Sequence, residues 1–148
     1  MNPCSFSGIK FHRSSLTEDE FELFVTACDG LSTFAVEMYA TPRQLITHVE
    51  GLARILAMGG GIYDLQVGRF GPEFAGGAVQ IRFHVRGDVL FLGIHMQARH
   101  FEFGRFSVAP EGKLYVKAGL SALKHFVEEF RGLVDASRET ATLTSAAI

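Results

Sequence analysis

The sequence predicts an α+β fold: a single antiparallel sheet with two helices packed on one face, in the order β-β-β-α-β-β-β-β-α. Two segments in which apolar and polar residues alternate each contain a turn dipeptide, Asp29-Gly30 and Gly87-Asp88. Two other segments repeat apolar residues at helical spacing. The connections between successive strands are short, which favours antiparallel pairing.

The bulk properties are those of one soluble globular domain. The chain has 148 residues, of which 47% are hydrophobic and 20% charged, and a formal net charge of -2 gives no general attraction to nucleic acid or membrane. Because there is no export signal and no run of about 18 apolar residues, a cytoplasmic location and no membrane partner are expected. Cys4 and Cys28 lack the spacing of a metal or redox motif, so we expect ordinary thiols.

The first three strands are predicted over residues 7–15 and 21–38. A two-residue turn at Asp29-Gly30 places Val25 opposite Phe34 and puts the apolar side chains of both strands on one face.

A helix is predicted to follow the third strand. Thr41 is a suitable N-cap, Pro42 suits the first helical position, and Gln44 completes a capping box. Apolar residues continue at helical spacing until Gly59–Gly61, which ends the helix.

The second set of strands begins at residues 62–67 and continues, after a glycine-rich connection, with a hairpin that turns at Gly87-Asp88. This hairpin sets Phe83 opposite Leu92 with both side chains buried.

The buried phase changes after Ala98 from even to odd positions, which puts Phe101 and Phe103 on the core side and requires a turn or bulge. A strand at residues 114–116 and a helix that begins near residues 119–121 complete a single α+β domain over residues 1–135. Residues 136–148 are small and polar without periodicity, and we expect a flexible C-terminal tail.

One continuous core is expected from the apolar faces of these elements. Its predicted members are Phe21, Leu23, Val25, Phe34, Val36, Leu45, Leu52, Phe83, Leu92, Ile94, Leu123 and Phe130.

A polar patch is predicted on the outer face of the central strands. The registers place His95 between Gln80 and Glu102, with Gly93 as part of a shallow floor that a ligand or partner could approach. The binding residues predicted here are Arg82, His84, His95, Gln97 and Glu102.

The patch carries no recognisable catalytic or metal motif. His84 points away from the other groups, and neither H-E-x-x-H nor G-x-S-x-G occurs, so we predict no catalytic residues, no metal and no cofactor. Basic residues stand beside aromatic ones, as in a sheet that stacks RNA bases, but the register buries Phe83 and Phe101. No nucleic-acid partner is therefore expected.

A second surface is predicted on the first hairpin. Its register puts Glu22 directly opposite Glu37 on the outer face, beside Glu20. Like charges that face each other across strands are unfavourable, and a basic partner protein would relieve the repulsion.

The segments TPRQL (residues 41–45) and LSALKHF (residues 120–126) stand in an order of elements that resembles small bacterial α+β families, some of which are immunity proteins of polymorphic toxin systems. The resemblance covers about residues 6–134. It implies a protein that binds and blocks a cognate toxin, with no catalytic residues.

The sequence therefore predicts a non-enzymatic protein-binding module, with an immunity-type protein as its specific form. The alternative is a small-ligand-binding protein or enzyme that uses Arg82, His95, Gln97 and Glu102. A homo-oligomer in which a second copy covers one sheet face stays open as a third class.

Overall fold

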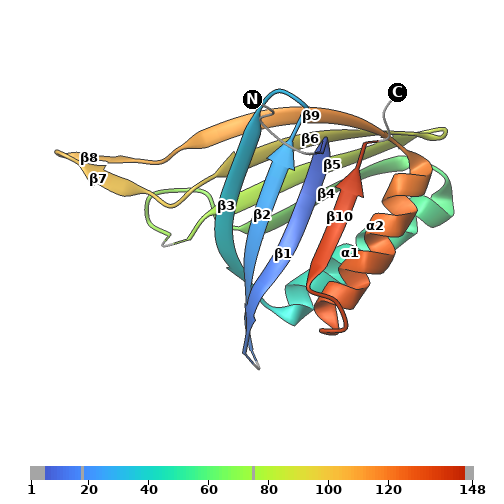
Figure 1. Ribbon diagram of the computed structural model, residues 1–148, viewed down its shortest axis with the longest axis horizontal. Helices are drawn as coiled ribbons and strands as arrows, with labels where there is room; N and C mark the ends of the chain where they lie inside the picture. Colours follow the sequence, from blue (N-terminus) through green and yellow to red (C-terminus); the bar gives the residue numbers. More distant parts are fainter. Residues whose placement is uncertain (1–5, 18, 75, 146–148) are drawn as a thin grey trace.

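The computed structural model describes residues 6–17, 19–74 and 76–145 of the chain, which fold into two four-stranded antiparallel sheets, two helices and a short projecting hairpin (Figure 1). Sheet A has the strand order β10-β1-β2-β3, and sheet B has the order β4-β5-β6-β9. The elements are β1 (Gly8–Leu16), β2 (Phe21–Cys28), β3 (Thr33–Ala40), α1 (Pro42–Met58), β4 (Gly61–Gly68), β5 (Ala78–Arg86), β6 (Val89–Gln97), β7 (Phe101–Phe103), β8 (Phe106–Val108), β9 (Glu111–Gly119), α2 (Leu120–Val134) and β10 (Thr140–Thr144).

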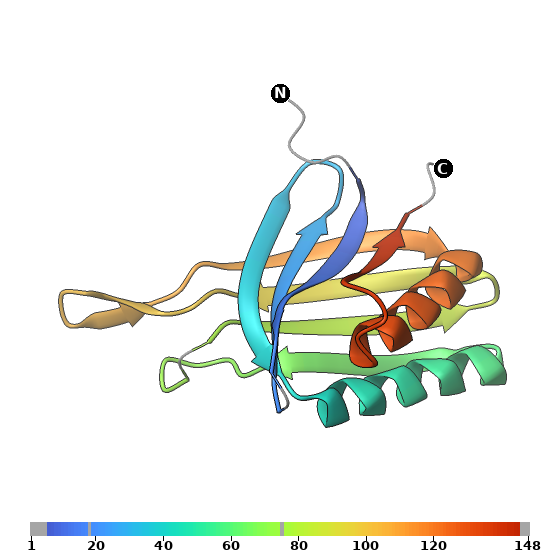
Figure 2. The same ribbon diagram turned by 60° about the horizontal axis from the view of Figure 1, so that its bottom comes forward.

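The prediction of a single sheet with two helices on one face is wrong, because three antiparallel sheets are present. Sheet A packs on one face of sheet B, and the strands of the two sheets cross steeply (Figures 1 and 2). Helices α1 and α2 lie beside sheet A and cover the rest of that face of sheet B. The order of elements does not reveal whether strands before a helix pair with strands after it. Here α1 carries the chain from one sheet to the other.

The start and end of α1 are as predicted. The Thr41 hydroxyl accepts a hydrogen bond from the Gln44 amide at 3.2 Å, and the Gln44 side chain accepts one from the Thr41 amide at 2.9 Å. Gly59 ends the helix with a φ of 77°, a left-handed conformation that suits glycine. No helix in the described part of the chain is long and apolar enough to cross a membrane.

The first hairpin turns through four residues and not through two. Val25 pairs with Val36 in place of Phe34, and the loop spans residues 29–32. The Asp29 carboxylate accepts hydrogen bonds from the amides of Ser32 at 2.7 Å and Leu31 at 2.9 Å, which lower its pKa and hold the wider turn. Because the slip is two residues, the buried side chains keep their face.

The central hairpin has the predicted register, since Phe83 pairs with Leu92 and Ile81 with Ile94. The strand on the other side of β6 is β9, so that Gly93 pairs with Tyr115.

The predicted core is buried with one exception, since Phe34 is only partly buried and packs against it. Aromatic rings join the layers: Phe126 of α2 contacts Phe11 of β1 and Phe83 of β5, with ring centroids 5.9 and 6.1 Å apart.

The C-terminal segment differs from the expected tail, because β10 pairs with β1 as an edge of sheet A and buries Ala141 and Leu143. Ala141 is too small to have signalled a buried strand. The prediction of an ordinary thiol is wrong for Cys28, which is disulfide-bonded, and Cys4 lies outside the described residues.

Candidate functional site

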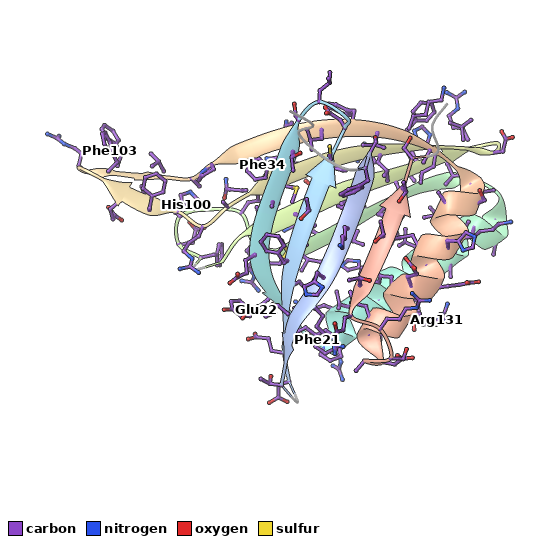
Figure 3. The ribbon with its side chains drawn as sticks, viewed as in Figure 1. Phe21, Glu22, Phe34, His100, Phe103 and Arg131 are labelled. Carbon is purple, nitrogen blue, oxygen red and sulfur yellow. The ribbon has the colours of Figure 1, made fainter. Side chains whose placement is uncertain are left out.

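A hairpin of β7 and β8 projects from the body of the molecule as a continuation of β6 and β9 (Figure 1). We call residues 98–110 the arm. Its base is held by a hydrogen bond from the Ala98 amide to the Pro110 carbonyl at 2.9 Å, and its turn contains Gly104 at a φ of 62°. In Figure 3, His100 lies near the base of the arm and Phe103 at its tip.

One face of the arm is apolar and exposed. Phe101 pairs with Val108 and Phe103 with Phe106, and since directly opposite residues and residues two apart share a face, all four side chains lie together. They are 55%, 37%, 70% and 63% exposed in that order. The prediction that Phe101 and Phe103 are buried is therefore wrong.

The phase change predicted after Ala98 is present as an offset in pairing. Gln97 pairs with Glu111, but Phe101 pairs with Val108, so one residue is inserted on the first of the two strands. The insertion lies at Arg99-His100, because Ala98 still bonds to Pro110.

The outer face of sheet B holds four of the predicted binding residues: Arg82 and His84 on β5, and His95 and Gln97 on β6. Gly93 lies between Arg82 and Tyr115 in the register and leaves a shallow depression of about 370 Å³ toward His95. An adjoining depression of about 320 Å³ extends toward His84, Phe91 and Lys117.

Charged and polar contacts fix the side chains around these depressions. The Arg82 guanidinium donates two hydrogen bonds to the Asp64 carboxylate, at 2.8 and 2.9 Å, and these lower the pKa of Asp64. Both side chains are largely exposed, so the pair adds little stability.

His95 meets Glu111 and not Glu102. The Glu111 carboxylate accepts a hydrogen bond from the Gln97 amide group at 2.9 Å, and its other oxygen lies 2.9 Å from His95 Nε2, so both contacts lower the pKa of Glu111. The Phe70 ring stacks on His95 with centroids 4.6 Å apart, which holds the loop after β4 on the sheet. The alternation of Glu111, Lys113 and Tyr115 could have indicated this strand, for which only residues 114–116 were predicted.

The other predicted binding residues lie elsewhere. Glu102 is on the arm, and Glu20, Glu22 and Glu37 belong to the other sheet or its loop, with Glu22 away from the arm (Figure 3). The prediction that Glu22 faces Glu37 is wrong, because Glu22 pairs with Tyr39 and Glu37 with Phe24. No group of three or more His, Cys, Asp or Glu side chains that could hold a metal occurs among the described residues.

A further polar contact joins α1 to β4. His48 Nε2 lies 2.9 Å from the Gln66 carbonyl and donates to it, and Nδ1 lies 2.7 Å from the Tyr63 hydroxyl, from which it accepts a hydrogen bond when the imidazole is neutral. Burial lowers the pKa of His48 and raises that of Tyr63.

We predict that His48 makes the folded state less stable in mild acid. Because the folded pKa of His48 lies below its ordinary value of 6.5, its contribution is fully present above pH 6.5 and is lost as the pH falls toward the lower folded pKa. Urea unfolding between pH 7.5 and 5 should therefore show a larger loss for the natural chain than for His48→Gln. Parallel pH profiles of the two proteins would contradict this prediction.

No protein-family model and no curated protein matches the sequence. Among solved structures, a chain of the "CdiA-CT/CdiI toxin and immunity complex from Enterobacter cloacae" is similar, with a TM-score of 0.46 and 10% sequence identity. The match covers 88% of this chain and 99% of that chain.

Proposed function

We propose that this chain is a non-enzymatic protein-binding module whose partner binds the apolar face of the arm. The observation that carries the proposal is the exposure of Phe101, Phe103, Phe106 and Val108 on one face. Contiguous apolar patches on a folded surface are typical of interaction sites, and buried aromatic anchors supply much of the affinity at protein interfaces.

The attachment of the arm supports this function. An isolated two-stranded hairpin is marginally stable, but here both strands continue strands of sheet B. The aromatic side chains are therefore presented on a preformed support, which reduces the entropy that binding must overcome.

The specific form of the proposal is an immunity-type protein, in which the partner is a toxin that the bound arm blocks. The order of elements around TPRQL and LSALKHF supports a toxin as the first partner to test.

A small-ligand site over Gly93 is the second candidate function. The two adjoining depressions favour it, since about 370 Å³ lies within the usual range for ligand pockets. The residues proposed for this ligand site include Glu111, which contacts His95 and Gln97, in place of Glu102, which lies on the arm.

The proposal is tested by photo-crosslinking in the cells that make the protein. With p-benzoylphenylalanine at position 103 we expect one discrete protein adduct, and none with the same group at Lys124, which is exposed on α2. The crosslinked protein is then purified and titrated against the natural chain. Phe103→Ser and Phe106→Ser should each weaken binding about tenfold or more.

The matched control is Ser107→Ala, on the opposite face of the arm, which should leave affinity unchanged. The proposal fails if no adduct forms at position 103, or if the Phe103 and Phe106 variants bind as tightly as the control.

A further inference from the structure

We infer that the partner docks by adding a β-strand to the open edge of β3, so that the added strand crosses the arm as β3 crosses the rest of sheet B. This inference rests on the proposed function and specifies how the partner is held.

The first step concerns the side on which the apolar face lies. Residues 109–110 join β8 to β9, and the hydrogen bond from Ala98 to Pro110 keeps the register of the Gln97–Glu111 pair through this connection. Alternation counted through it places Val108 and Phe106 on the same side of sheet B as buried Leu114 and Val116. The inserted residue in the first strand brings Phe101 and Phe103 to that side as well. The apolar face of the arm is thus a continuation of the core face of sheet B.

The second step concerns the place where sheet A stops covering the core face of sheet B. Sheet A covers the core face of sheet B, and β3 is its edge strand. At the base of the arm, the space beside Gly112 is filled by the Phe34 ring, 3.0 Å from where a Cβ would stand. Gly77 similarly sits against the Glu37 and Gln97 carbonyl oxygens. The arm therefore begins where β3 crosses sheet B, as the ribbon also indicates (Figure 2).

The third step concerns the edge of β3. The Glu37 carbonyl accepts a hydrogen bond from the Gly77 amide at 3.2 Å, so Glu37 points its backbone groups away from β2. In an antiparallel pair this direction alternates, and Ala35 shares it. In the described part of the chain no hydrogen bond reaches Ala35 from this side. An edge of this kind is a template for another strand.

These steps identify the occupant by its chemistry. It is an extended segment that bonds to β3 near Ala35 and directs alternate apolar side chains onto the arm. Strands lie about 4.8 Å apart, and the five residue steps from Ala98 to Phe103 span roughly 16 Å, so the arm has room for about three strands. A second copy of this chain is a poorer occupant. If its β3 paired with this β3, its own sheet B would come to lie where the arm of this copy projects, and the two would collide.

The test replaces the backbone donor that the inference requires. Proline is tolerated on an edge strand where its missing N–H faces solvent, so Ala35→Pro should fold and weaken binding of the crosslinked, purified partner tenfold or more. Ala35→Thr, which keeps the N–H, is the matched control and should bind normally. In the natural chain, amide exchange of Ala35 measured by NMR should slow at least tenfold in the complex, a readout that needs no variant.

The outcomes separate this inference from the proposed function. Loss of binding in Phe103→Ser together with normal binding in Ala35→Pro and unprotected Ala35 would leave the arm as the site and overturn strand addition. Normal binding in all these variants would overturn both. If the chain alone forms a dimer in sedimentation that Ala35→Pro abolishes, the edge belongs to a second copy and the inference is wrong.

Discussion

Phe126→Ala should lower the free energy of unfolding by about 3 to 5 kcal/mol. The side chain is fully buried and contacts rings of three elements, with Phe130 of its own helix 5.3 Å away in addition to those of β1 and β5. Its removal opens a cavity where α2 joins sheet A to sheet B. Urea unfolding followed by circular dichroism measures the change.

The control for this prediction is Phe106→Ala on the arm, where the side chain is exposed. Its free energy of unfolding should stay within about 0.5 kcal/mol of the natural chain. A loss below about 1 kcal/mol in Phe126→Ala would contradict the packing of the Phe126 ring against both sheets.

Gly51→Ala should destabilise the protein by about 1 to 3 kcal/mol, although alanine is the better helix former. A Cβ at this position of α1 would stand inside the ring of Tyr63, which lies across the helix. The ring cannot move away without breaking its hydrogen bond to His48. Thermal and urea unfolding measure the loss.

Gly132→Ala in α2 is the matched control. A Cβ there would stand 2.8 Å from Cδ of Arg138, a flexible side chain on the surface that can shift. We expect a change within about 1 kcal/mol in either direction. Equal losses in the two variants would show that the Tyr63 ring is not the cause.

Local features of the fold could be predicted from the sequence, whereas long-range ones could not. The capping box at Thr41 and the pairing of Phe83 with Leu92 depend on residues close in the chain. The choice of β9 as the neighbour of β6, and of β10 as the neighbour of β1, depends on contacts between distant segments. The predicted register of the first hairpin was wrong by two residues, because the side chain of Asp29 can hold a four-residue loop as well as a two-residue turn.

The candidate site was predicted in part for the same reason. Alternation within β5 and β6 places Arg82, His84, His95 and Gln97 on one face, but it cannot supply Glu111 from a strand whose length was underestimated. The change of the apolar phase after Ala98 predicted that Phe101 faces the core side of sheet B. Alternation gives the side of a residue and not what covers it, so the exposure of the arm could be found only in three dimensions.

The arm is an insertion between Gln97 and Glu111, two residues that are already paired. Lengthening a connection between paired strands costs little, about 0.6 kcal/mol for each doubling of its length, because the strands on either side need not move. The length and sequence of the arm can therefore be changed while the packing of sheet B is kept. Replacing residues 98–110 by another two-stranded hairpin should therefore change partner choice without redesign of the scaffold.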